Sequence, residues 1–200
     1  SESAIPLHYV IEEVLPRVRT SLPSTISLHY EEESPTGSVW ADPAHLEQIL
    51  INLCHNATYA MKDKGGTLTL TLAEVSADAI ASNQFVALPP GPYMRLTVRD
   101  TGHGIAPEFL SRIFDPFFTT KGIGEGSGLG LSIVHSIVTN SKGAITVEST
   151  QGQGSAFHVY LPRFEVTETA AESSASVAYT GEGRLLVVDN DAAVTQVTQQ

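Results

Sequence analysis

Apolar side chains recur every three or four residues over Ile5–Leu22, which predicts an amphipathic helix near the start of the chain. Two short strands are expected to follow, at Ser24–Tyr30 and Gly37–Trp40. The segment Asp42–Asp63 then begins with an N-cap aspartate and a proline at the first helical position. Because it ends before two glycines, it predicts a second helix.

Later segments alternate between strand and loop patterns. Strands are predicted at Thr67–Glu74, Tyr93–Arg99, Ala144–Ser149 and Ala156–Leu161, and a helix at Gly128–Ser141. The segment Val75–Pro92 ends in LPPGP and is expected to be a loop. Glycines without periodicity over Thr101–Ser127 indicate a long mobile loop.

The composition changes after Phe164. Residues 165–183 contain no Lys or Arg and few large apolar groups, which predicts a flexible acidic linker. The following RLLVVDND is an apolar strand that ends in acids. We therefore expect a folded domain over residues 1–164, a linker over 165–183 and the start of another domain over 184–200.

The charge balance excludes some partners. Lys and Arg number 11 against 22 Asp and Glu, for a net charge of -11. Nucleic acids and anionic membranes attract basic surfaces, so we expect no nucleic-acid partner and no direct membrane contact. The single cysteine, Cys54, cannot form an internal disulfide, and no apolar run approaches the length of a membrane span. A cytoplasmic location is expected.

A polar stripe runs along the second predicted helix. At helical spacing it contains His45, Gln48, Asn52, Asn56 and Tyr59, apart from the apolar side chains that face the core. Asn is a mediocre helix former, so two of them in mid-helix need a reason. A carboxamide oxygen can ligate Mg²⁺ and its NH₂ group can donate to phosphate. The alternative is a stripe of ordinary exposed polar residues.

An aspartate follows the strand predicted at Tyr93–Arg99. In DTGHGI, residues 100–105, Asp100 can accept a hydrogen bond from an exocyclic amine, and the glycines allow a planar ligand to approach the backbone. The alternative is a turn stabilised by an Asx-type hydrogen bond.

Two further motifs border the predicted loop. In IFDPFFTTK, residues 113–121, three Phe side chains are expected to anchor the loop, and Lys121 is a candidate phosphate contact. The glycine-rich GIGEGSGLGL, residues 122–131, precedes a helix, so its N–H groups can cradle phosphate without net positive charge. It lacks the Lys-Ser/Thr pair of a P-loop, and no strand precedes it as in a Rossmann turn.

In this order the four motifs resemble those of sensor histidine kinases. HLEQILINLCHNATYAM is similar to the N-box, DTGHGI to the G1 box, IFDPFFTTK to the F-box and GSGLGLSIV to the G2 box. The resemblance covers about Asp42 to Pro162. It implies a two-layer α/β sandwich of the Bergerat type, in which a mixed β-sheet packs on helices under a mobile ATP lid, as in gyrase B, Hsp90 and MutL.

The resemblance also implies ATP and Mg²⁺ as cofactors and assigns roles to residues. Asn56 becomes the metal ligand, Asn52 and Lys121 the catalytic residues at the phosphates, and Asp100 the adenine contact. The remaining nucleotide-binding positions are Tyr59, Gly102, Gly104, Ile105, Gly126, Ser127, Gly128, Leu129, Gly130 and Leu131. Tyr59 stands where many relatives have Lys or Arg, and Ser155 where relatives often have Thr near the adenine.

The implied function is transfer of the γ-phosphoryl group of ATP to a histidine on a separate dimerisation domain, in two-component signalling. A receiver domain, own or separate, is the second implied partner, since RLLVVDND resembles the first receiver strand. There Asn190 follows Asp189, where a second acid is expected. The source is then a hybrid kinase, truncated at both ends.

Two other functions stay open. An ATP-hydrolysing switch of the gyrase or Hsp90 type would place a Glu base where this chain has Asn52, and Glu47 lies about 140° round the helix from it. A non-catalytic nucleotide-binding module is the third possibility. None of the seven histidines lies in a context like the phosphoacceptor box of the family.

Overall fold

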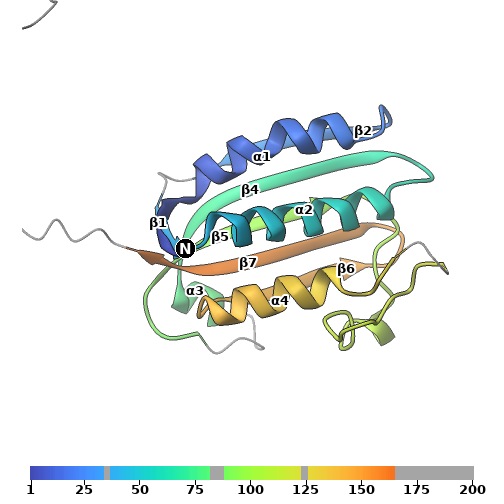
Figure 1. Cartoon of the computed structure of the whole chain (residues 1–200). Coiled ribbons are helices and arrows are strands. Elements are labelled where there is room, and N and C mark those ends of the chain that lie inside the picture. The colour runs from blue at the N-terminus through green and yellow to red at the C-terminus, as the bar shows by residue number, and fades with distance from the viewer. Residues whose placement is uncertain (34–36, 82–87, 123–125, 165–200) are drawn as a thin grey trace, which may run out of the picture. The chain divides into compact units, whose positions relative to one another are not determined.

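A mixed sheet of seven strands carries three helices on one face in the computed structural model, which describes residues 1–33, 37–81, 88–122 and 126–164 (Figure 1). The strands are β1 (Ser3–Pro6), β2 (Ile26–Glu32), β3 (Ser38–Ala41), β4 (Gly66–Ser76), β5 (Pro92–Asp100), β6 (Ala144–Thr150) and β7 (Gly154–Phe164). The covering helices are α1 (Leu7–Ser21), α2 (Pro43–Ala60) and α4 (Gly130–Asn140); α3 (Ala77–Ala81) and a 3₁₀ turn at Pro107–Phe109 are short.

Strand β7 organises the sheet. One of its sides pairs with β5, while the other pairs with β6 over Gly154–Tyr160 and with β3 at Arg163 and Phe164. The strand order is β1-β3-β7-β5-β4-β2, and only β2 and β4 are parallel. The predicted two-layer sandwich of helices on a mixed sheet is confirmed.

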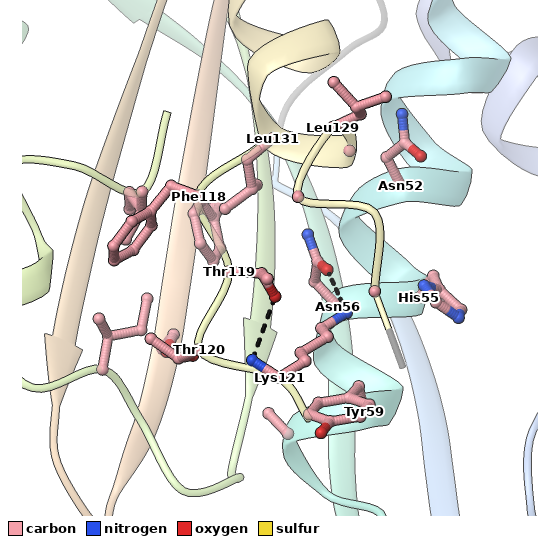
Figure 2. Close-up of a pocket in the computed structure, with 18 of the residues that line it drawn as sticks. Asn52, His55, Asn56, Tyr59, Phe118, Thr119, Thr120, Lys121, Leu129 and Leu131 are labelled. Atoms are coloured by element: carbon pink, nitrogen blue, oxygen red, sulfur yellow. Dashed lines mark hydrogen bonds between the residues drawn. The ribbon is translucent and has the colours of Figure 1, made fainter. Parts of the chain in front are cut away.

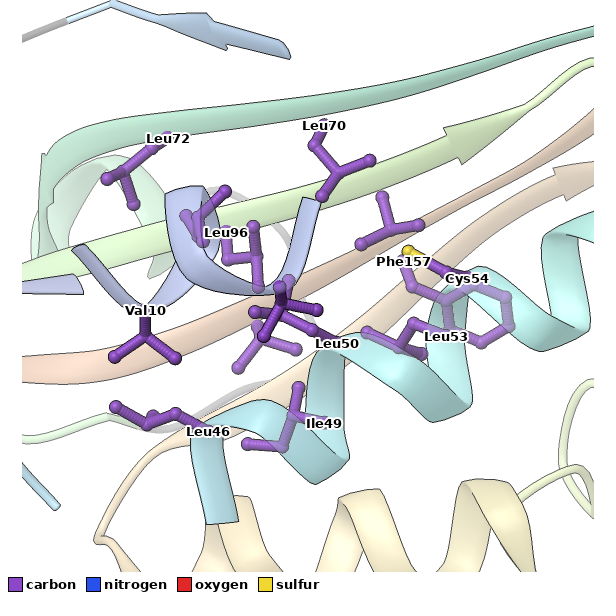
Figure 3. Close-up of a cluster of buried hydrophobic side chains, with 14 of the residues drawn as sticks. Val10, Leu46, Ile49, Leu50, Leu53, Cys54, Leu70, Leu72, Leu96 and Phe157 are labelled. Carbon is purple, nitrogen blue, oxygen red and sulfur yellow. The ribbon is translucent and has the colours of Figure 1, made fainter. Parts of the chain in front are cut away.

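The core lies between the sheet and the helices (Figure 3). Alternate leucines of β4 point toward the helices, because successive strand residues face opposite sides. Helix α2 contributes Leu46, Ile49, Leu50 and Leu53, each no more than 3% exposed. Burial of such a side chain stabilises the fold by about 1.5–3 kcal/mol, so α2 is held with its polar stripe in a fixed orientation.

Two predicted segments differ from the structure. The helix expected from Ile5 begins at Leu7, because Ile5 belongs to β1 and pairs with Val39 of β3. The expected loop Val75–Pro92 was wrong in part: β4 continues to Ser76 and α3 follows. The helix forms where Ile80 packs against Tyr93 and Tyr160, on the sheet face opposite the other helices.

Other boundaries differ by a few residues. Helix α2 ends at Ala60 rather than Asp63, and α4 begins at Gly130 rather than Gly128. The predicted linker and the predicted partial domain, residues 165–200, lie outside the described residues. Within the described part of the chain, no helix is long and apolar enough to cross a membrane.

Candidate functional site

A cavity of about 350 Å³ lies between α2, the end of β5 and the segment that leads into α4. This volume is in the range of small-molecule sites. All the predicted site residues except Gly102 line it, although they come from positions 52 to 131 of the sequence. After the roles that the sequence resemblance implies for these residues, we call the end at Asp100 the adenine end and the end at Asn52, Asn56 and Lys121 the phosphate end.

Asp100 ends β5 and is 5% exposed. Its partners across the sheet are Leu68 and Ser155, and its Oδ1 accepts a hydrogen bond from the Gly102 N–H at 2.8 Å. Burial raises the pKa of Asp100, while backbone N–H groups of Gly102 and Ser155 oppose the rise. Such a buried carboxylate can accept a further hydrogen bond from a ligand amine.

Gly102 shapes the turn after β5 without lining the cavity. A Cβ at this position would lie 2.5 Å from the Ala60 carbonyl oxygen, so a side chain does not fit. The next residue, His103, donates its backbone N–H to the same carbonyl at 3.1 Å. The turn is thereby fixed against the end of α2, which joins the two walls of the cleft.

At the phosphate end, the α2 side chains face the cleft one above another (Figure 2). Asn56 Oδ1 accepts a hydrogen bond from Lys121 Nζ at 3.0 Å, and this ammonium lies 4.4 Å from the centroid of the Tyr59 ring. Asn52 Nδ2 is buried and has no hydrogen-bond partner among the described residues. The end therefore offers a buried amide donor, an ammonium and an amide oxygen that already attracts a positive charge.

His55 also lines this end of the cavity. Burial lowers its pKa, and the nearby charge of Lys121 lowers it further. The imidazole is therefore neutral at pH 7. His55 lies three residues after Asn52, so helical spacing alone was sufficient to place it on the stripe.

A backbone hydrogen bond joins two distant residues of the segment between β5 and α4, and we call this point the base of the loop between them. The Phe117 N–H donates to the Gly128 carbonyl at 2.9 Å. Gly128 has φ +68°, and a Cβ there would lie 2.5 Å from the Phe117 carbonyl carbon, so glycine is required. Gly130, which begins α4, would place a Cβ 3.6 Å from Asn52 Oδ1. The glycines thus bring the α4 N-terminus next to α2.

The aromatic anchors of this segment differ from the prediction. Phe114 and Phe118 pack against the core, and Phe118 lies 5.8 Å from Phe109 between ring centroids. The Phe117 side chain, in contrast, is 75% exposed among the described residues, with φ +67°, so it is not one of the expected anchors. The buried anchor is Ile113, at 7% exposure, which sequence reasoning overlooked. A positive φ is uncommon for a bulky residue, so the sequence did not indicate that Phe117 would be exposed.

Several other lining residues were not predicted: His55, His103, Ile113, Phe118, Thr119, Thr120, Ile133 and Phe157. Strand alternation could have found Phe157, since Ser155 is two residues earlier on β7 and lines the same cavity. Among the residues that the structure describes, Asp100 is the only carboxylate that lines the cleft. Glu47, the one acid of α2, pairs instead with Arg17 at 2.7 Å.

Residues 41–165 match the family of histidine kinase-, DNA gyrase B-, and HSP90-like ATPases. The chain belongs to this ATPase family. Sensor kinase CckA of Brucella abortus (strain 2308) is 37% identical over 166 residues, which are 78% of this chain and 17% of CckA. Sensor histidine kinase ZraS of Escherichia coli (strain K12) is 36% identical over 160 residues, 80% of this chain and 30% of ZraS.

Solved structures agree with the assignment to the ATPase family. The mycobacterial sensor histidine kinase MprB has a TM-score of 0.63 at 28% identity, covering 82% of this chain and 98% of that one. The catalytic domain of histidine kinase ThkA has the same score and identity, covering 82% and 96%. The predicted resemblance to the ATP-binding domain of histidine kinases is confirmed, whereas the individual site residues stay predictions.

Proposed function

We propose that this chain binds Mg·ATP in the cleft and presents the γ-phosphoryl group to a histidine of a separate dimerisation domain, as the catalytic domain of a sensor histidine kinase. The adenine would lie at the adenine end, with its amine on Asp100. The phosphates would lie at the phosphate end, near Asn52, Lys121 and the glycines before α4.

One observation supports transfer over hydrolysis. The α2 position nearest the start of α4 carries Asn52, an amide that cannot take a proton from water, and the only acid of α2 is occupied by Arg17. A missing general base typically forfeits roughly 10²–10⁴ in rate. Positioning and charge neutralisation are sufficient for phosphoryl transfer to an external nucleophile.

The chain's own residues have separate tasks in this proposal. The Asn52 amide donates to a phosphate oxygen, which gives its buried NH₂ group a partner. The Lys121 ammonium neutralises developing charge, and the N–H groups around Gly128 and Gly130 accommodate the phosphates. Bound Mg²⁺ would screen the phosphate charges, with Asn56 Oδ1 as its protein ligand. Asn56 fits this role because its oxygen already accepts from a cation.

The wider assembly is part of the same proposal. We place the catalytic domain at residues 1–164, a linker at 165–183 and the start of a receiver domain at 184–200. A cytoplasmic hybrid kinase, with a dimerisation domain and its own or a separate receiver as partners, would have this order.

Labelled ATP separates the candidate functions. The isolated chain should bind ATP, hydrolyse it slowly and acquire no phosphohistidine of its own. Addition of the parent kinase's dimerisation domain should produce a label on that domain that is acid-labile and alkali-stable. Asn52→Ala should reduce this transfer, with Gln48→Ala, also on the polar stripe but outside the cavity lining, as the control.

Each alternative has its own outcome. Rapid ATP hydrolysis by the isolated chain would favour the ATP-hydrolysing switch of the gyrase or Hsp90 type. Nucleotide binding without transfer to any parental histidine would favour the non-catalytic binding module.

A further inference from the structure

A serine of β6 joins three parts of the adenine end. Ser149 is not among the described residues that line the cavity. Its Oγ accepts a hydrogen bond from the Ile105 N–H at 2.8 Å and lies 2.9 Å from Ser155 Oγ. It also lies 3.1 Å from the Gly154 carbonyl oxygen, to which it can donate. One hydroxyl group thus contacts both the turn after β5 and the start of β7.

Ser155 connects this network to the cavity. It is directly opposite Asp100 in the pairing of β5 with β7, so the two side chains leave the sheet on the same face, with Cβ atoms about 4.5–5.5 Å apart. Both residues line the cavity, and each is 5% exposed. A ligand group that reaches the Asp100 carboxylate can therefore reach the Ser155 hydroxyl as well.

The direction of the Ser155 hydroxyl follows from a count of protons. Ser149 has one hydroxyl proton, and the Gly154 carbonyl can only accept. When this proton goes to the carbonyl, the lone pairs of Ser149 accept from the Ile105 N–H and from the Ser155 hydroxyl. All three hydrogen bonds then form, whereas donation from Ser149 to Ser155 leaves the Gly154 contact without a proton. Ser155 therefore directs its proton to Ser149 and presents lone pairs to the cavity.

We infer that Ser149 is a positioning residue that favours purines with an amino group at the 6-position, because it keeps the Ser155 hydroxyl an acceptor. An amino group has two protons and can donate to both the Asp100 carboxylate and Ser155. A 6-oxo group meets two acceptors and no donor. The inference rests on the proposed function, since it places the base next to Asp100, and it adds a residue of base selection that does not itself touch the nucleotide.

Further contacts hold the β6–β7 hairpin against the turn after β5. The Gly152 N–H donates to the His103 carbonyl at 2.7 Å. Gly104 has φ +68°, and a Cβ there would clash with the Thr150 carbonyl oxygen, so the two backbones are in close contact. Loss of the Ser149 hydroxyl leaves these contacts in place. Ser149→Ala should therefore change the direction of a hydroxyl group rather than the shape of the cavity wall.

Base selectivity is the quantity to measure. Calorimetry on the full chain gives the dissociation constants of ADP and of inosine diphosphate, which carries a 6-oxo group in place of the amine. The wild-type chain should bind ADP more tightly. Ser149→Ala frees the Ser155 proton to reach the 6-oxo group. The ratio of the inosine diphosphate constant to the ADP constant should then fall about two- to tenfold, the size of one hydrogen bond.

Three further variants test whether the effect passes through the two hydroxyl groups. Ser149→Thr keeps an Oγ at a strand position, where threonine is favourable, and should keep the wild-type ratio. In a Ser155→Ala background, Ser149→Ala should no longer change the ratio. Ser21→Ala is the matched control, because Ser21 Oγ also donates to a backbone carbonyl, that of Val18, at the end of α1 and away from the residues that line the cavity.

Other results overturn the inference. If Ser149 is merely structural, Ser149→Ala weakens the binding of both nucleotides equally and the ratio is unchanged. A fall in the ratio that persists in the Ser155→Ala background, or that Ser149→Thr shows as well, excludes the hydroxyl direction as the cause. Equal binding of ADP and inosine diphosphate by the wild type contradicts the proposed position of the base. Failure of the wild type to bind ADP overturns the proposed function itself, and the inference with it.

Discussion

The adenine end and the phosphate end of the cleft are built differently. Asp100 comes from a central strand, is 5% exposed and is already bonded to the Gly102 N–H. At the phosphate end, Asn52 Nδ2 has no partner among the described residues, and Asn56 is bonded to a lysine of the segment before α4. One end is fixed by the sheet, while the other depends on a contact that a ligand can replace.

This difference suggests separate roles for the two ends in the proposed function: selection of the base at one, and dependence on phosphates and metal at the other. In the proposed function, Asp100 is already held in place before ligand arrives, so it would select the base at little reorganisation cost. In the same proposal, phosphates and metal would replace the hydrogen bond between Lys121 and Asn56, so binding at the phosphate end would depend on whether metal is present. Nucleotide affinity should therefore be sensitive to substitution of Asp100 at the adenine end. At the phosphate end, it should be sensitive to whether Mg²⁺ is present.

The largest effect is expected at the adenine end. Asp100→Asn keeps an oxygen that can accept from the Gly102 N–H, but its NH₂ group would face the adenine amine, so that two donors meet. An unmatched buried polar group costs about 1–3 kcal/mol, so ADP binding should weaken about 5- to 150-fold. Calorimetry measures the loss. Thermal unfolding should show no destabilisation, because the variant removes a buried charge. Equal binding of GTP and ATP by the wild type would contradict the assignment of Asp100.

A smaller effect is expected for Asn56, the proposed metal ligand. Asn56→Asp should steepen the dependence of ADP affinity on Mg²⁺ by roughly tenfold, because a carboxylate binds the metal more strongly and repels metal-free phosphates. Titrations in Mg²⁺ and in EDTA give the two affinities. Equal changes in both would mean that Asn56 is structural.

The pH should affect ADP affinity and the stability of the ligand-free chain in opposite senses, both through Asp100. Because the native pKa of Asp100 is raised, its carboxylate takes up a proton above the usual Asp range. As pH falls through that value, ADP affinity should fall, up to about tenfold per unit. The stability of the ligand-free chain responds oppositely: its contribution from Asp100 is present below the unfolded pKa and lost as pH rises through the native one. Asp100→Asn should abolish both trends.

The smallest effects concern the anchors of the phosphate-end segment. Phe118→Ala should lower the free energy of local opening by about 1–3 kcal/mol, since Phe118 packs against the core. Phe117→Ala should change it by less than about 0.5 kcal/mol, because Phe117 is 75% exposed. Hydrogen exchange of the neighbouring amides reports both. A larger effect of Phe117→Ala would show that its ring has a contact on this domain.

Local signals predicted most of the fold. The N-cap Asp42, whose Oδ1 accepts from the Ala44 N–H at 3.0 Å, placed the start of α2 correctly. The alternation along β5 placed Asp100 at a strand end. Periodicity and capping are properties of a few neighbouring residues, so a sequence displays them directly.

Features that depend on distant pairing were not predicted. Residues Ser3–Pro6 form β1 only because β3 is beside them, and α3 forms over aromatic residues of β5 and β7. The bond between Lys121 and Asn56 joins segments far apart in the chain. Helical spacing and motif position placed both residues among the candidates, but their contact depends on the path of the segment between β5 and α4.

The hydrogen bond between Phe117 and Gly128 makes the chain between them a closed loop with a fixed base. The entropy of closing such a loop grows only with the logarithm of its length, by about 0.6 kcal/mol for each doubling. Residues inserted after the exposed Gly122 would therefore cost little thermodynamically and would leave the hydrogen bond between Phe117 and Gly128 in place. A reporter peptide grafted there, rather than at the base where Gly128 must be glycine, would give a signal that follows occupancy of the cleft.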